Sequence, residues 1–320
     1  MNDYNGGPID EVYANKRLRN EPLVEITQAK GTSETHPFLS KNDEWANFEV
    51  PTNHPGEKVP SNLSGSYVRD AYLRGLTLAK EGISNPFKFG IIGSSDTHVG
   101  GGSYTEETHF SKIGLLDGEP YLRGSVPFRG IYGFFTKLLR PEAIIEVDEN
   151  NYLGVSTRLI RFGSSGLAGV WAEENTREAI YEAFKRKETF GTSGPRIKLR
   201  FFAGYSFDDS NLVDTNLIKK AYAQNTTMGG TIQSEKSIEP KFLIWAISDP
   251  NGAPLQRVQV IKGWLEDGVH REKIFDVACS DGLIVNPKTN RCPDNKAEVN
   301  LADCSFSSEE RDVELKTFWQ

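Results

Sequence analysis

The segment from residue 88 to residue 102, KFGIIGSSDTHVGGG, constrains the fold of this chain most strongly. Its short apolar run, Phe89, Ile91 and Ile92 with glycines between them, is bounded by turn residues. That pattern is typical of a buried strand in a parallel sheet. Polar residues follow at once, and parallel α/β folds place their chemistry at this end of the strand. The segment therefore predicts a functional site just beyond its apolar run.

Asp96 and His98 stand two positions apart in the polar part of this segment. Side chains alternate along an extended chain, so the two are expected to point the same way. A carboxylate and an imidazole on one side suit a divalent metal, with zinc–ligand distances of about 2.0–2.2 Å. The alternative is that His98 caps a loop and Asp96 closes an Asx turn. Spacing alone leaves both interpretations open, because D-x-H is a short pattern.

The composition favours a folded protein, and the length of 320 residues allows one large domain or two moderate ones. Hydrophobic residues make up 37% and charged residues 25%, which is enough for a globular core. The net charge of −7, without a basic block, argues against a nucleic-acid partner. No apolar run approaches the ~18 residues of a membrane span, and nothing in the sequence indicates an oligomeric state.

The three cysteines, Cys279, Cys292 and Cys304, all lie near the C-terminal end in polar, loop-like sequence. They form no C-x-x-C pair, which favours a disulfide-bonded loop over a zinc site. An odd count leaves one thiol over: either it is free, or its partner lies beyond Gln320. A disulfide is typical of oxidising compartments, so we expect a periplasmic or secreted protein.

The expected elements alternate between helix and strand up to about residue 195, which is the order of an α/β fold. They are a helix over 9–19, a strand over 23–27, a helix over 67–80, the strand before Asp96, a strand over 167–172 and a helix from residue 175. A short apolar helix is also expected over 131–139, more readily as a core helix than as a lid over a site. We therefore predict an α/β domain over residues 1–195.

Beyond residue 195 the hydrophobic period changes to two, which predicts antiparallel strands. The segments concerned are 197–202, 242–247 and 257–262, with a further strand near 315–318. Residues 249–252, DPNG, are expected to form a hairpin turn between two of them. Residues 196–320 are therefore predicted to be a β-rich region that carries the cysteine loop.

Several stretches resemble a known family. Residues 95–98, SDTH, are similar to the last metal-binding motif of the PHP (polymerase and histidinol phosphatase) superfamily. Residues 166–202, GLAGVWAEENTREAIYEAFKRKETFGTSGPRIKLRFF, resemble an uncharacterised bacterial family of PHP-like metal hydrolases, a domain of unknown function. Residues 23–49 and 279–295 resemble the same family, so the likeness spans nearly the whole chain.

The resemblance implies an incomplete, distorted PHP-like (β/α) barrel with divalent metals, Zn, Mn or Fe, at its C-terminal mouth. It implies a hydrolase, most readily a phosphoesterase that acts on a small phosphorylated substrate with metal-activated water. Asp96 and His98 carry over directly as ligands. Glu34 and His36 lie where a further ligand motif is expected, and Glu25 is a weaker candidate within a strand. For Glu34 and His36, the alternative is that they are solvated polar groups of a loop.

Two arginines are candidates for holding the phosphate. Arg196 or Arg177 could bind it through two hydrogen bonds, although each serves equally well as a surface ion-pair residue. Catalytic residues beyond the metal ligands are not indicated.

One departure from the family pattern is expected to matter. PHP enzymes begin with a His-x-His pair, and none of the five histidines here forms one. The chain is therefore expected to be a fragment that lacks the opening strand and the extreme C-terminus, where a fourth cysteine belongs. Its metal site would be incomplete and would bind metal more weakly. The alternative function is a non-catalytic secreted binding protein on the same scaffold.

Overall fold

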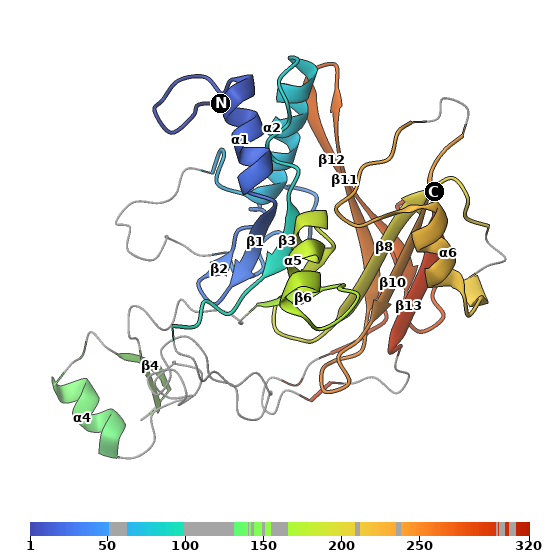
Figure 1. The fold of residues 1–320 in the computed structure, drawn as a ribbon. Helices are drawn as coiled ribbons and strands as arrows, with labels where there is room; N and C mark the ends of the chain where they lie inside the picture. Colours follow the sequence, from blue (N-terminus) through green and yellow to red (C-terminus); the bar gives the residue numbers. More distant parts are fainter. Residues whose placement is uncertain are drawn as a thin grey trace.

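A computed structural model describes residues 1–50, 63–98, 131–139, 141, 144–148, 151–154, 166–208, 212–234, 238–298, 300, 305–306 and 312–320. Most of its elements fall into two groups: helices and short strands from the N-terminal half, and longer strands from the C-terminal half (Figure 1). The elements expected from the sequence appear in the expected order, with shifts of a few residues at their ends. The structure adds elements that the sequence did not predict: β2, β4, β5, β7, α6, β9 and β12.

The N-terminal group contains a three-stranded sheet with the order β2-β1-β3. Its elements are α1 (Glu11–Asn20), β1 (Leu23–Gln28), β2 (Gly31–Thr32), α2 (Val68–Lys80) and β3 (Gly90–Gly93). Strands β1 and β3 run parallel, and their register pairs Glu25 with Ile92. The expectation of a parallel strand before Asp96 is thereby confirmed.

A small core holds α1 and α2 to each other and to the segment that leads into β3. Ile9, Ala14, Leu78 and Phe87 are its buried members. Helix α1 begins where the Asp10 carboxylate accepts a hydrogen bond from the backbone N–H of Tyr13, as a capping residue does. The core fixes the start of β3, and therefore the place where its far end lies.

A hairpin-like pair lies against β3. It consists of β6 (Leu167–Val170) and β7 (Thr189–Thr192), joined through α5 (Arg177–Arg186), and the two strands are antiparallel. The backbones of β3 and β7 approach closely at two glycines. A Cβ on Gly191 would lie 2.4 Å from the backbone nitrogen of Gly93, and one on Gly93 would lie 2.6 Å from the carbonyl oxygen of Thr192. Only glycine permits this approach.

The sheets of the described residues stay small, and those residues close no barrel. A strand of a (β/α) barrel would pair in parallel with its neighbours, whereas β6 is antiparallel to β7. The structure is therefore a mixed α/β protein that is rich in strands.

The C-terminal group is an antiparallel sheet with the strand order β13-β10-β8-β9. The strands are β8 (Lys198–Gly204), β9 (Thr226–Thr227), β10 (Lys241–Ile247) and β13 (Glu314–Trp319). Helix α6 (Leu217–Gln224) packs on it, and β11 (Arg257–Glu266) and β12 (Val269–Cys279) form a separate long hairpin. The antiparallel strands expected in this half are confirmed.

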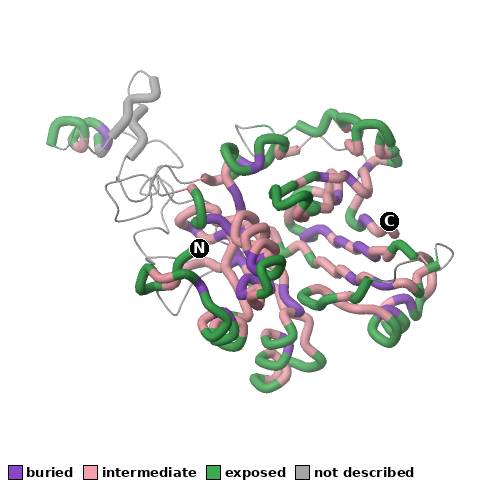
Figure 2. Tube along the Cα trace, turned by 90° about the horizontal axis from the view of Figure 1, so that it is seen from above, coloured by how far each residue is buried: buried purple, intermediate pink, exposed green. Residues whose placement is uncertain are grey.

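The two faces of β10 have different partners, because successive side chains alternate. Leu243 packs with residues of α6, whereas Ile244 and Ala246 pack with Val258 of the hairpin. Figure 2 shows buried residues along the inner strands and exposed ones on the outer turns and helices. The sheet is thus covered on both sides.

The turn at residues 249–252 is not the hairpin turn that its sequence suggested. Strand β10 pairs with β8 and β13, and β11 pairs with β12, so the turn joins two strands that do not pair. The carboxylate of Asp249 instead accepts a hydrogen bond of 2.6 Å from the backbone N–H of Arg196. This bond lowers the pKa of Asp249, and burial opposes it only in part.

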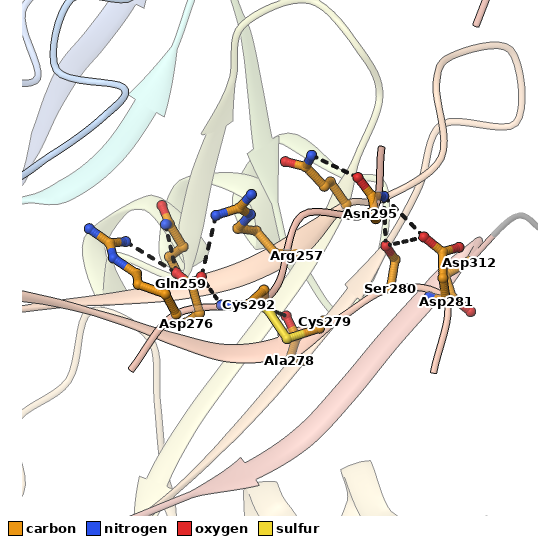
Figure 3. Close-up of a disulfide and its surroundings, with 12 residues drawn as sticks. Arg257, Gln259, Asp276, Ala278, Cys279, Ser280, Asp281, Cys292, Asn295 and Asp312 are labelled. Carbon is orange, nitrogen blue, oxygen red and sulfur yellow. Dashed lines mark hydrogen bonds and ion pairs between the residues drawn. A yellow bond between two sulfur atoms is a disulfide. The ribbon is translucent and has the colours of Figure 1, made fainter. Parts of the chain in front are cut away.

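A disulfide between Cys279 and Cys292 closes the loop after β12, so the prediction of a disulfide-bonded loop is confirmed (Figure 3). Cys304 lies outside the described residues. The nearby carboxylate of Asp276, fully buried, accepts a hydrogen bond of 2.6 Å from the backbone N–H of Cys292 and lies 3.3 Å from both Arg257 and Arg291. Two guanidinium groups and a backbone N–H together stabilise this buried charge.

A third set of elements contains α4 (Ile131–Leu139), β4 (Ile144–Asp148) and β5 (Asn151–Gly154). The helix expected over 131–139 is confirmed, but Ile131, Phe134 and Leu138 are exposed, so a core position is wrong for these side chains. None of the helices in the described ranges is long and apolar enough to cross a bilayer.

Candidate metal centre at the end of strand β3

The C-terminal ends of β1 and β3 bring two segments of the chain together. Beyond β3, the backbone N–H of Ser94 donates a hydrogen bond of 2.9 Å to the carbonyl oxygen of Thr27 in β1. Residues 29 and 30 turn the chain from β1 into β2, since Gln28 pairs with Gly31. Because β1 and β3 are parallel, Lys30 and the residues after Ser94 lie at the same edge of the sheet.

Asp96 and His98 face each other at this edge. The backbone of Asp96 is left-handed, with a φ of 52°, a conformation that Asp tolerates better than most residues. Its Oδ1 lies 3.4 Å from Nε2 of His98, and its Oδ2 lies 2.6 Å from Nζ of Lys30. The Asp96 side chain is 18% exposed and that of His98 60%. The two residues come together as the sequence suggested, but through the left-handed backbone of Asp96 and not along an extended strand.

Glu25, the weaker candidate, lies on β1 beside this edge. Its carboxylate accepts a hydrogen bond from the hydroxyl of Ser94, which precedes Asp96 by two positions. The carboxylate is therefore directed at the segment that carries Asp96.

Glu34 contacts α2 and not the metal candidates. Its Oε1 accepts hydrogen bonds from both Nε and Nη2 of Arg69, and Nη1 of the same arginine lies 2.6 Å from Oδ2 of Asp43. Burial lowers the pKa of Arg69, but the two carboxylates outweigh that effect and raise its pKa above the ordinary value. Glu34 thus tethers the loop after β2 to α2.

His36 belongs to the same loop, and its imidazole packs against aromatic rings of the protein. Its ring stacks on Phe38 at 5.3 Å between centroids and tilts against Tyr67 at 5.6 Å. Its Nδ1 accepts a hydrogen bond of 3.2 Å from the backbone N–H of Phe38. The remaining histidines of the sequence are His54 and His109, outside the described residues, and His270, whose Nε2 lies 2.8 Å from the hydroxyl of Thr77.

The two candidate phosphate-binding arginines lie on separate elements. Arg177 begins α5 and lines a cavity of about 610 Å³ along that helix, together with Glu178 and Tyr181. Arg196 precedes β8, where its backbone binds Asp249.

The donor set at the end of β3 fits part of a metal centre. A carboxylate oxygen and an imidazole nitrogen suit Zn, Mn or Fe. Within the described part of the chain, no group of three His, Cys, Asp or Glu residues lies close enough to hold a metal ion. The described residues therefore bring together two candidate ligands, Asp96 and His98, and Glu25 lies next to them through Ser94.

Sequence reasoning missed the residues that organise this edge. Lys30 and Ser94 each bind a residue far away in the sequence, Asp96 and Glu25 respectively. The turn residues that follow β1 were the one available signal for Lys30, because a short turn at the end of a parallel strand must lie beside the end of its neighbour.

Comparison with known proteins identifies a family without a known activity. A family model described as "Protein of unknown function (DUF3604)" matches residues 1–320. No curated protein and no solved structure matches the chain. The chain therefore belongs to the DUF3604 family of proteins of unknown function.

Proposed function

We propose that this protein is a metal-dependent hydrolase of PHP type, a phosphoesterase that acts on a small phosphorylated molecule with activated water. The observation that carries the proposal is the contact between Asp96 and His98, 3.4 Å apart at the C-terminal edge of a parallel strand pair. This is the edge at which α/β enzymes carry their chemistry. The resemblance of residues 95–98 to a PHP metal motif supports the same reaction class and, with it, a partial barrel scaffold.

Asp96 and His98 would hold the metal, and Glu25 is the nearest additional carboxylate. A bound Zn, Mn or Fe ion would lower the pKa of a water molecule toward ~7 and offset charge on phosphate oxygens. Two protein ligands are fewer than the three of typical catalytic zinc sites, so we propose that the others come from outside the described residues. Glu34 and His36 could serve as metal ligands only after Glu34 leaves Arg69 and His36 leaves Phe38 and Tyr67.

The chain's own residues would prepare this edge for an anionic substrate. Lys30 contributes a positive charge 2.6 Å from Asp96, and its side chain stays partly exposed. His98 is mostly exposed, so a ligand can reach its imidazole. Arg177 or Arg196 would clamp the phosphate through two hydrogen bonds.

The test is hydrolysis of p-nitrophenyl phosphate by the whole chain with and without Mn²⁺ or Zn²⁺. We expect turnover only with metal, and we expect D96N to abolish it. D267N is a matched control, since Asp267 is an exposed aspartate in the same left-handed conformation, with a φ of 51°, in the turn between β11 and β12. Equal metal-dependent activity in wild type and D96N would reject the site.

The alternative is a non-catalytic binding protein on the same scaffold. It is favoured by the ion pair of Asp96 with Lys30, which neutralises the carboxylate without a metal. Absence of both metal and turnover in the purified protein would support it. In either case we propose a periplasmic or secreted location, because the Cys279–Cys292 disulfide is typical of oxidising compartments.

A further inference from the structure

A second feature lies where α2 runs beside the β11–β12 hairpin, near the start of β3 and not at the end that leads to Asp96 (Figure 1). A cavity of about 520 Å³ opens between them, and residues from the segments 85–89 and 229–231 also line it. This volume is within the range of about 300–1,000 Å³ typical of small-molecule sites. Its lining includes none of Asp96, His98 and Lys30.

The cavity has an apolar wall that remains open to a ligand. Leu73 and Leu76 of α2 line one side and are only partly buried. Ile261 of β11 also lines the cavity, and 38% of it is exposed. Apolar surface that the protein leaves uncovered inside a cavity favours a ligand with an apolar body.

One carboxylate of the lining lacks a hydrogen bond. Glu272 of β12 has a side chain that is only 17% exposed, and its nearest cation is Nη1 of Arg69, at 3.8 Å. That distance is beyond a hydrogen bond. The nitrogens of Arg69 donate to Glu34 and Asp43, and within the described part of the chain no other donor reaches Glu272. Its oxygens are not wholly buried, so solvent still reaches them, and a ligand donor can take the place of that solvent.

The charge balance around Arg69 defines the ligand further. Three carboxylates, from Glu34, Asp43 and Glu272, surround this one guanidinium. Carboxylates therefore outnumber the cation at this end of the cavity, which favours a cationic group beside Glu272. The other cation of the lining, Lys88, is exposed, so solvent and salt screen its charge.

We infer that this cavity binds a small organic amine, with its ammonium group on Glu272 and its apolar body between α2 and β11. A charge-assisted hydrogen bond anchors the ammonium, and Leu73, Leu76 and Ile261 cover the apolar part. The inference does not depend on the chemistry at Asp96.

The probe is 2-phenylethylamine, titrated into the whole protein by calorimetry, with 3-phenylpropanoate as an anion of similar size. We expect the amine to bind wild type and the anion not to bind. E272Q should bind the amine about tenfold more weakly or worse, because a charged hydrogen bond is lost. E266Q is the matched control, since Glu266 lies on the same hairpin but is exposed and paired with Arg271.

A second pair of variants tests the apolar wall without touching the charges. I261S should weaken binding of the amine several-fold, whereas I284S, at a residue that is 81% exposed and absent from the lining, should not. Equal amine binding by wild type, E272Q and I261S would overturn the inference. So would binding of 3-phenylpropanoate as tight as that of the amine, or no heat from the amine at millimolar concentration.

Discussion

Nζ of Lys30 lies 2.6 Å from Oδ2 of Asp96, and this ion pair joins the turn after β1 to the segment after β3. A lysine ammonium and a metal ion compete for the negative charge of one carboxylate, so each weakens the binding of the other. The pair therefore holds Asp96 in place and also competes with any cation that Asp96 would bind.

Replacing Lys30 by Gln is expected to strengthen metal binding at Asp96, because it removes the competing charge while it keeps a side chain of similar length. We expect a gain of several-fold in Mn²⁺ affinity, measured by calorimetry at low ionic strength, where such effects are largest. K41Q, at an exposed lysine, is the control. Weaker binding by K30Q would show that Lys30 assists the metal instead of competing with it.

Replacing Arg69 by Met is expected to destabilise the fold strongly. The Arg69 side chain is 13% exposed and its partner Asp43 only 3%, so the change leaves a buried carboxylate without its cation. Breaking such a pair costs about 3–5 kcal/mol in the free energy of unfolding. Urea denaturation measures it. R74M, which removes the more exposed i,i+4 pair with Asp70, should cost less than about 1 kcal/mol. Similar losses in both variants would contradict this account.

Reduction of the disulfide is expected to destabilise the C-terminal half. Cys279 and Cys292 are 13 positions apart, and closing a loop of this size stabilises by about 3 kcal/mol in the chain-entropy treatment. The C279S/C292S double variant should unfold at correspondingly lower urea. In the wild type, the thiol count in denaturant should rise by two on reduction. A count that stays constant would exclude the disulfide.

Stability is expected to fall at high pH through Tyr72. Burial raises the pKa of its phenol to about 12, from an ordinary value of 10. A pKa raised by folding stabilises the protein below the unfolded value, and the contribution is lost between about pH 10 and pH 12. The loss is at most about 2–3 kcal/mol.

Urea denaturation at pH 9 and pH 11.5 measures this effect. Y72F should show a smaller loss between the two pH values than wild type, whereas Y4F, at a residue that is 84% exposed, should match wild type. Y72F also loses the hydrogen bond of 3.1 Å from the Tyr72 hydroxyl to the carbonyl oxygen of Phe89, at a cost of about 1 kcal/mol at both pH values. Identical pH dependence in all three proteins would refute the assignment.

Local patterns predicted many of the elements, because each depends on residues close in sequence, but they missed β7, α6 and β12. The apolar run before Asp96 gave a parallel strand, and residues 242–247 gave an antiparallel one. Pairing was harder, because it depends on partners far away in the chain. Residues 249–252 have the residue types of a hairpin turn, yet the carboxylate of Asp249 accepts a hydrogen bond from the backbone of Arg196, which is distant in the sequence. The direction of β6 was missed for the same reason.

The candidate site was predicted only in part. Asp96 and His98 were found because they are two residues apart, and the structure brings them together. The ion pairs of Lys30 with Asp96 and of Arg69 with Glu34 span 66 and 35 positions, so no local pattern indicates them. The disulfide was expected from the clustering of cysteines in one polar loop, which is again a local signal.

We propose that Asp96 and His98 bind one divalent cation between them. The most direct measurement is a titration with Mn²⁺ that follows the imidazole proton resonances of the histidines, assigned through H98Q and H270Q. Paramagnetic Mn²⁺ should broaden the His98 resonance first in wild type and leave His270, which lies beside Thr77, sharp. D96N should remove that broadening. A His98 resonance that stays sharp at millimolar Mn²⁺, or that broadens equally in D96N, would contradict the account.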